Sequence, residues 1–471
     1  MSSLAKKGAW VALDNMSAAA LAFLFFVLTA RYLSQEEFGV AALALGVIQI
    51  AQPLIESLFH DALIQKTELS DADIATAASA SVVWSFVLTA AICVFSPFIS
   101  EILSTPSLAI FLVPLSSICI FTGLAAVPAA IARRHMEFRR LAIRTILGRI
   151  TGIGIGLAML WQGFGVWSVV AQAIISSGLS AALLLVASPR PTGRLNWIQL
   201  KPLILFGLPT VGTQFLWYAN SRLITLIIGG ALGPIAAGNW NVATRFVEPL
   251  QALLATTVGQ FLLPLLARKN DESHAMQQPF LTGTHAMATV LMPSFFGLAA
   301  CSPIALVVLV GEKWLEAAPI MQLVCLVNLA LLIRQLAEIA LTVSGRPRYT
   351  FYTHIIATSC SLIGSASGAY FGLMPSVCGW STRAIPFLTI NVIFVTKVLG
   401  ISYIDQISPL WRPLTASCVM VAVILYLEHE FGSSVSSINM LLIMISAGII
   451  TYGSTLLCFD PTVKAIVLRR I

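Results

Sequence analysis

Charged side chains are scarce in this sequence: they make up 10% of its 471 residues, whereas 58% of the residues are hydrophobic. A soluble protein of average composition is about 25% charged, so this chain cannot cover itself with a water-exposed surface. The composition therefore excludes a soluble enzyme or binding domain and indicates a membrane protein. At about 34 residues for one span with its connection, the chain has room for about 14 spans of roughly 20 apolar residues each.

Motifs for metal, disulfide and nucleotide chemistry are also missing. The eight cysteines stand singly in or beside apolar stretches, without the paired spacing of a metal site or a disulfide framework. No G-x-x-x-x-G-K-[ST] segment is present, which argues against direct use of ATP through a phosphate-cradling loop. The net charge is +7, but most basic residues lie in short connections, where they meet anionic lipid headgroups. We expect no cofactor, no metal and no nucleic acid.

The hydrophobic pattern predicts an all-α, polytopic membrane protein with about 14 transmembrane helices. The expected spans cover residues 8–31, 38–59, 74–99, 107–132, 142–162, 164–187, 203–230, 234–266, 280–311, 319–344, 349–373, 375–400, 410–428 and 438–458. Basic residues in short loops stay on the cytoplasmic side of a membrane. Most of the 27 lysines and arginines fall on that side when the amino terminus is cytoplasmic, so we expect both termini in the cytoplasm.

A weak internal repeat predicts two lobes. The stretch Leu33–Gly39 resembles Leu232–Gly238, and Gln52–Leu54 resembles Glu248–Leu250. Two copies of six helices, with the same orientation, suit a transporter that rocks two halves around a midplane site. Chance recurrence of Leu, Gly and Pro in apolar sequence is the alternative. The predicted division is an N-lobe over residues 1–195, a C-lobe over 196–400, and two further helices with a cytoplasmic C-terminus over 401–471.

Glycines spaced four residues apart predict close helix packing. The pairs are Gly152/Gly156, Gly364/Gly368 and Gly368/Gly372. Small residues at this spacing let helix backbones approach each other inside a membrane. We therefore interpret them as packing positions and not as a nucleotide loop.

Several ionisable residues fall inside the expected spans, where each costs from about 2.5 kcal/mol upwards. Each should therefore face a watery cavity or a partner. A guanidinium group stays charged and offers paired donors to phosphate, so arginines around one cavity would bind an anionic headgroup such as that of a diphosphate-linked lipid. The candidate substrate-binding residues are Arg222, Arg245, Arg334 and Arg383.

A purely structural role is the alternative for these residues. Arg245 and Glu248, like Arg334 and Glu338, lie on one helical face and can neutralise each other. The buried acids can serve ion coupling during transport or hydrogen bonding between helices. These acids are Asp14, Glu56, Glu248 and Glu338.

Six arginines gather between residues 133 and 149. They are Arg133, Arg134, Arg139, Arg140, Arg144 and Arg149. The cluster suggests a cytoplasmic patch that recruits anions, and the alternative is the topological anchor that loop charges commonly provide.

Several short segments of the chain are distinctive. They are Ala30–Gly39 (ARYLSQEEFG), Ala62–Lys66 (ALIQK), Arg134–Leu141 (RHMEFRRL) and Gly163–Trp167 (GFGVW), with a fainter signal over Gly238–Arg245 (GNWNVATR). These segments resemble the bacterial polysaccharide transporters of the Wzx type, nearest the branch that handles exopolysaccharide and lipopolysaccharide. The resemblance covers roughly residues 1–400 and is strongest in the first half of the chain.

This resemblance implies membership of the multidrug/oligosaccharidyl-lipid/polysaccharide exporter superfamily, with two six-helix lobes around a central cavity and alternating access. Wzx-type members are thought to flip undecaprenyl-diphosphate-linked oligosaccharide units across the bacterial inner membrane for surface or exopolysaccharide synthesis. Such a protein is a transporter and not an enzyme. Its expected partners are the lipid-linked oligosaccharide, the bilayer and the polysaccharide polymerase machinery.

Two other functions stay open. An ion-coupled multidrug efflux transporter of the same superfamily should have fewer arginines in its lumen and should bind cations. A membrane polysaccharide polymerase or ligase usually carries a long external loop for sugar chemistry, and the longest outer connection expected here is short by comparison.

Overall fold

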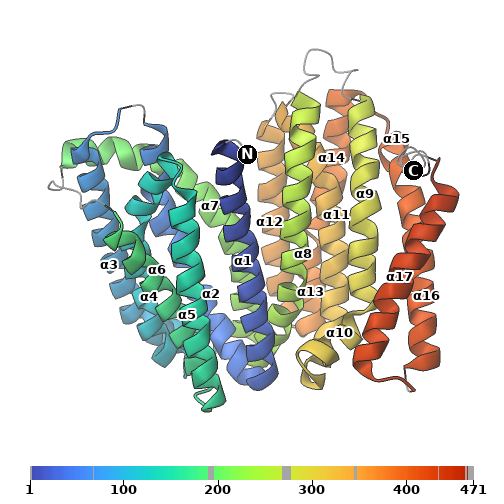
Figure 1. Ribbon diagram of the computed structural model, residues 1–471, viewed down its shortest axis with the longest axis horizontal. Coiled ribbons are helices and arrows are strands. Elements are labelled where there is room, and N and C mark those ends of the chain that lie inside the picture. The colour runs from blue at the N-terminus through green and yellow to red at the C-terminus, as the bar shows by residue number, and fades with distance from the viewer. Residues whose placement is uncertain are drawn as a thin grey trace. The chain divides into compact units, whose positions relative to one another are not determined.

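The computed structural model describes residues 3–66, 68–188, 196–267, 277–343, 347–432, 434–461 and 464. Every regular element in these ranges is a helix (Figure 1), which confirms the all-α prediction. The chain forms two compact units, Met1–Asn241 and Val242–Ile471. This division describes packing, whereas the predicted lobe boundaries describe a repeat, and those boundaries stay a prediction.

Unit 1 is a bundle of long helices. They are α1 (Ser3–Tyr32), α2 (Gln35–Gln65), α3 (Asp71–Ile102), α4 (Leu108–Arg134), α5 (Phe138–Trp161), α6 (Val166–Val186) and α7 (Trp197–Leu232), followed by the first turns of α8 (Pro234–Ala267).

Serine residues fix where two of these helices begin. The hydroxyl of Ser34 accepts a hydrogen bond from the backbone N–H of Glu37, and the Glu37 carboxylate accepts one in return from the N–H of Ser34. Ser70 and Asp73 form the same reciprocal pair at the start of α3. Each capping box satisfies backbone N–H groups that have no partner within the helix. These residues therefore set the position at which the helix begins.

Helices α5 and α6 pack backbone to backbone. A Cβ atom added to Gly152 would lie 2.7 Å from the carbonyl oxygen of Gln172 and 2.9 Å from Cβ of Ser176. Gly156 is similarly close to the carbonyl of Ser168. The predicted packing role of Gly152 and Gly156 is therefore confirmed.

The first turns of α7 run across the ends of neighbouring helices (Figure 1, green, upper left). Leu200 and Leu203 join a buried cluster with Phe59 of α2 and Val127 of α4. Gly207 is so close to α2 that an added Cβ would meet the carbonyl oxygen of Leu58. The start of α7 is therefore fixed within unit 1.

Unit 2 contains several interrupted helices. After α8 come α9 (Gln277–Ala300), α10 (Ser302–Leu309), η2 (Glu312–Ala317), α11 (Ala318–Val343), α12 (Pro347–Ala369), α13 (Leu373–Ser381), α14 (Ala384–Leu399), α15 (Tyr403–Ile407), η3 (Ser408–Leu410), α16 (Trp411–Phe431) and α17 (Ser437–Phe459).

Helices α12 and α13 form a tight hairpin. An added Cβ at Gly364 would lie 2.3 Å from the carbonyl oxygen of Gly379, and one at Gly368 would lie 2.3 Å from that of Pro375. The hydroxyls of Ser365 and Ser376 form a hydrogen bond, with 2.9 Å between the two Oγ atoms. The Gly364/Gly368 prediction is thus confirmed. Gly372, in contrast, lies in the turn before α13 with φ of 122°, a conformation that favours glycine.

The protein is a multi-pass membrane protein. Among the described residues, ten helices are long and apolar enough to cross a membrane, or eleven if α9 and α10, bent by 65°, count as one span. The exact number of fourteen spans stays a prediction.

Candidate functional site

The eight ionisable residues that the sequence placed in spans divide between the two units. Asp14 lies on α1, Glu56 on α2 and Arg222 on α7, all in unit 1. Unit 2 holds the others: Arg245 and Glu248 on α8, Arg334 and Glu338 on α11, and Arg383 between α13 and α14.

Asp14 is half-buried and stands among arginines of α4 and α5. Its charge interacts most strongly with Arg144, then with Arg149 and Arg133. Its Oδ1 atom is buried and has no hydrogen-bond partner among the described residues. Glu56, exposed on α2, acts electrostatically on the same Arg144. The structure therefore brings two of the predicted acids to one group of arginines.

Each arginine of this group has a different contact. Arg149 Nη1 donates to the carbonyl oxygen of Ala18 on α1, 2.8 Å away. Arg133 contacts Nε2 of His60, whose Nδ1 lies 2.7 Å from the carboxylate of Asp61. Arg144 has a buried Nε that makes no hydrogen bond within the described ranges. An unmatched donor and the unmatched oxygen of Asp14 thus lie in one neighbourhood.

Sequence reasoning assigned these three arginines to a connection, together with Arg134, Arg139 and Arg140. Arg144 and Arg149 in fact lie well inside α5, within the stretch 142–162 that the hydrophobic pattern had already assigned to a span. The position of these two arginines within the predicted span was therefore the sequence signal that could have placed them inside a helix. We call Arg133, Arg144 and Arg149, with Asp14 and Glu56, the unit 1 cluster.

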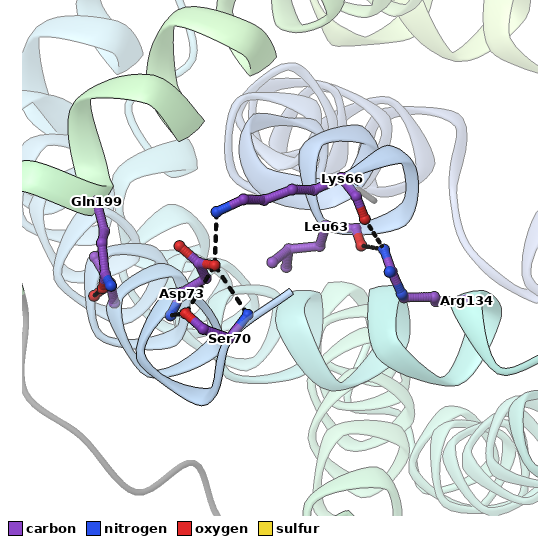
Figure 2. A network of polar contacts seen from close by, with 7 residues as sticks. Leu63, Lys66, Ser70, Asp73, Arg134 and Gln199 are labelled. Atoms are coloured by element: carbon purple, nitrogen blue, oxygen red, sulfur yellow. Dashed lines mark hydrogen bonds and ion pairs between the residues drawn. The ribbon is translucent and has the colours of Figure 1, made fainter. Parts of the chain in front are cut away.

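The other three arginines of the run hold local structure together. Arg134 Nη1 donates to the carbonyl oxygens of Leu63 and Lys66 at 2.8 and 2.6 Å and so closes the end of α2 (Figure 2). Arg140 pairs with Glu137 at 2.8 Å. Arg139 lies over the ring of Trp10, 5.9 Å from its centroid.

Figure 2 also shows how the same end of unit 1 is joined to α3 and α7. Lys66 Nζ is 2.7 Å from the carboxylate of Asp73, which is 3% exposed. The hydroxyl of Thr76 donates to Oε1 of Gln199 at the start of α7, over 3.3 Å. These contacts join the end of α2 to the starts of α3 and α7.

In unit 2, Arg334 is bound into the fold. It is 6% exposed, and its Nη1 donates to Oε1 of Gln406 at 3.2 Å. Gln406, 1% exposed, donates in turn to Thr396 Oγ1 at 2.9 Å. Glu338 lies 3.4 Å from Nε2 of His354. In the described contacts, the two members of the proposed Arg334–Glu338 pair therefore meet different partners.

Arg383 stands at an interruption within one span. Pro386 has no N–H to donate to the carbonyl of Thr382, which instead accepts from Ile385 at 3.0 Å. The half-buried guanidinium of Arg383 lies over the ring of Trp380, 5.3 Å from its centroid. Its Nε is buried without a hydrogen-bond partner in the part of the chain described.

The last three candidates are less distinctive. Arg222, Arg245 and Glu248 are each half-buried, and each is engaged by neighbouring groups. Across the described ranges, no three His, Cys, Asp or Glu side chains gather closely enough to hold a metal ion.

Comparison with known sequences identifies the family. The family model "Polysaccharide biosynthesis protein" matches residues 28–319. The chain is 24% identical over 430 residues to the succinoglycan biosynthesis transport protein ExoT of Rhizobium meliloti, which covers 90% of this chain and 87% of ExoT. It is 22% identical over 420 residues to the lipopolysaccharide biosynthesis protein WzxC of Escherichia coli, covering 87% and 84% of the two chains.

Comparison with solved structures identifies the fold. The lipid II flippase MurJ, in an inward closed conformation, superposes with a TM-score of 0.78 at 17% identity, covering 96% of this chain and 99% of MurJ. An inward-facing multidrug transporter of the MOP superfamily superposes with a TM-score of 0.52 at 11% identity, over 86% and 94% of the chains. The fold is that of the polytopic MOP transporters, and the chain belongs to the family of polysaccharide biosynthesis proteins.

Proposed function

We propose that this protein is a flippase that carries undecaprenyl-diphosphate-linked oligosaccharide units across the bacterial inner membrane, for the synthesis of surface or exported polysaccharide. The observation that carries the proposal is the presence of guanidinium groups inside the spans of a polysaccharide biosynthesis protein. A sugar diphosphate cannot cross about 30 Å of hydrocarbon unaided, because nothing there replaces its hydration. Charged groups of the protein, open to one side at a time, supply that replacement.

The unit 1 cluster suits a ligand with both acidic and hydroxyl groups. The free Nε of Arg144 is a donor for a phosphate oxygen, and the free Oδ1 of Asp14 is an acceptor for a sugar hydroxyl. A sugar attached to phosphate presents both groups side by side. In the proposed mechanism, Arg144, Arg149 and Arg133 bind the phosphate, and Asp14 contacts the first sugar.

The four arginines expected from the sequence have the same role in this proposal. Arg222, Arg245 and Arg383 are half-buried cations that attract the headgroup during translocation, and Arg334 is the fourth, with Gln406 as its present partner. The acids Asp14, Glu56, Glu248 and Glu338 couple translocation to an ion or pair helices. Coupling and binding together give alternating access between the two sides of the membrane.

The proposal also includes the cellular location of the protein and its orientation in the membrane. The protein lies in the bacterial inner membrane with both termini in the cytoplasm, is a transporter and not an enzyme, and delivers its cargo to the polysaccharide polymerase machinery. Its relatives ExoT and WzxC are named for polysaccharide transport and lipopolysaccharide biosynthesis, which supports the cargo class.

Depletion in the native bacterium tests this function. We expect the lipid-linked unit to become inaccessible to a membrane-impermeant reagent added outside, and surface polysaccharide to disappear, with both restored by the wild-type chain. Accessible but unpolymerised units would instead identify a polymerase. Unchanged polysaccharide with increased drug susceptibility would identify an efflux transporter, and either result would overturn the proposal.

A further inference from the structure

His60 links an acid of α2 to an arginine of α4 within unit 1. Its ring atom Nδ1 lies 2.7 Å from the carboxylate oxygen Oδ1 of Asp61, the next residue of the same helix. On the other side of the ring, Nη1 of Arg133 contacts Nε2. All three residues are half-buried. Arg133 belongs to the unit 1 cluster, whereas His60 and Asp61 are neighbours outside the proposed cargo contacts.

The two partners determine which ring atom of His60 carries the hydrogen. A guanidinium group has donors only, so Nε2 must offer its lone pair to Arg133. An ionised carboxylate only accepts, so the hydrogen of the ring lies on Nδ1 and points to Asp61. One form of the ring meets both requirements, a neutral imidazole with its hydrogen on Nδ1. An imidazolium would instead direct a second N–H group at Arg133.

A neutral acceptor holds an arginine without cancelling its charge. Arg140 shows the alternative within the same unit, because its Nη1 lies 2.8 Å from the carboxylate of Glu137 and the two charges compensate each other. The imidazole of His60 carries no charge, so the guanidinium of Arg133 keeps its own. The carboxylate of Asp61 is separated from Arg133 by the imidazole ring. Arg133 is therefore oriented without a direct ion pair in this set of contacts.

The electrostatic neighbours of Arg133 place its charge in the unit 1 cluster. Arg133 acts on Asp14 of α1 and on Arg144 of α5. Glu56, which acts on the same Arg144, lies four residues before His60 on α2. Residues at this spacing share one face of a helix. His60 and Glu56 are therefore both on the face of α2 that is turned toward the cluster.

We propose that His60 is a positioning residue for cargo recognition: its neutral ring, held by Asp61, fixes the guanidinium of Arg133 and leaves that charge available to the diphosphate. This inference rests on the proposed flippase function, in which Arg133 binds the phosphate. Because the headgroup meets an arginine that is already in place, less side-chain freedom is lost on binding. His60 itself does not touch the cargo.

Substitutions of His60 separate orientation from charge, with undecaprenyl diphosphate as the probe and the full-length protein in lipid nanodiscs. His60→Gln keeps a neutral acceptor for Arg133, so its affinity should stay within about twofold of the wild type. His60→Leu removes the acceptor and should weaken binding by about threefold to tenfold. His60→Glu keeps an acceptor but neutralises Arg133, so binding should weaken by about tenfold or more.

Two further variants and a stability measurement complete the series. Asp61→Ala removes the acceptor that holds the hydrogen on Nδ1, so its affinity should fall between those of His60→Gln and His60→Leu. His135→Glu places the same new acid at an exposed histidine near Arg133 and should change affinity by no more than about twofold. A merely structural role predicts that His60→Glu, which keeps a partner for Arg133, is as stable as the wild type and binds equally well. A positioning role predicts the same stability with the loss of binding.

Direct observation of the ring tests the inference even if a variant fails to fold. In wild-type protein labelled with ¹⁵N-histidine, the His60 signals, assigned by their loss in His60→Gln, should show a hydrogen on Nδ1 and none on Nε2 at about pH 8. A hydrogen on Nε2 would overturn the inference, because Arg133 would then have no acceptor on the ring.

The outcomes also separate the positioning role from the function on which it rests. A wild-type protein that neither binds undecaprenyl diphosphate nor moves the lipid-linked unit would overturn the flippase function itself. Wild-type binding and transport, together with undiminished binding by a folded His60→Glu variant, would leave that function in place and overturn the role of His60.

Discussion

The unit 1 cluster and the region around Arg334 in unit 2 hold buried charge differently. In unit 1, Asp14 and Arg144 lie in one neighbourhood, and each keeps a buried atom without a hydrogen bond in the described residues. In unit 2, Arg334 is bound to Gln406, and Glu338 meets His354. A charge that the fold has already satisfied stabilises structure, whereas an unsatisfied one is available to a ligand. On this ground we propose that the unit 1 cluster contacts the cargo, together with Arg383, whose buried Nε also makes no hydrogen bond to the described residues.

The largest effect is expected from Arg144→Gln. A charge-assisted hydrogen bond to phosphate contributes about 1.5–3 kcal/mol, so transport of the lipid-linked unit in proteoliposomes should fall by about tenfold to a hundredfold. The thermal midpoint should change little, because the buried Nε of Arg144 makes no hydrogen bond to the described residues. Full transport in a well-folded variant would remove unit 1 from the mechanism.

Substitution of Arg334 in unit 2 should lower the stability of the fold more than it lowers transport. Arg334→Met leaves the buried Oε1 of Gln406 without its donor, at a cost of about 1–3 kcal/mol in the free energy of unfolding. Arg334→Lys keeps a donor and should lose less. Denaturation of both variants in the same detergent measures the difference. If Arg334→Met unfolds like the wild type, the fold does not depend on this contact and the contrast between the units weakens.

A smaller and opposite effect should follow Asp14→Asn. Removing a carboxylate from among the arginines should tighten binding of undecaprenyl diphosphate without sugar by about twofold to fivefold, equivalent to about 0.5–1 kcal/mol. The gain should disappear for the sugar-bearing lipid, because an amide oxygen accepts a hydrogen bond from the sugar hydroxyl more weakly than a carboxylate does. Glu101→Gln, which changes an exposed acid of α3 outside the unit 1 cluster, is the matched control. Equal gains for both lipids would show that Asp14 does not contact the sugar.

The smallest effect is expected from Arg139→Gln. Arg139 belongs to the same run of arginines but lies over Trp10 as part of the local structure. A change of this kind should alter the free energy of unfolding by no more than about 0.5 kcal/mol and leave transport near the wild-type rate. A large loss of transport would mean that the whole run acts as one anion-recruiting patch.

Much of the fold could be predicted because a membrane imposes simple rules. The lengths of the apolar stretches predicted the long helices. The four-residue spacing of glycines predicted the close helix contacts at Gly152 and Gly364. Four of the five segments that resemble Wzx-type transporters lie at helix ends, whereas Gly238–Arg245 lies within α8. Ser34 and Glu37 cap α2, and Arg134 binds the carbonyls at the end of Ala62–Lys66. Such segments identify a lineage because the fold needs them, and they say little about cargo.

The candidate site could be predicted less well, because side-chain partners come from distant parts of the chain. Sequence spacing offered Glu338, four residues away, as one partner for Arg334, but it could not point to Gln406, which accepts from Arg334 and lies far along the sequence. Arg144 was grouped with the loop arginines, although it lies in α5 and interacts electrostatically with Asp14 of α1. Nε2 of His285 and Oδ2 of Asp460, 2.6 Å apart, likewise come from helices that no local spacing connects.

The most direct measurement is translocation of a fluorescent undecaprenyl-diphosphate oligosaccharide by the purified chain in proteoliposomes, compared with the same oligosaccharide on a neutral polyprenyl carrier. If buried arginines hold the anionic headgroup, the wild type moves the diphosphate-linked lipid and not the neutral one, and Arg144→Gln loses that preference. Equal movement of the two lipids, unaffected by Arg144→Gln, would contradict the account.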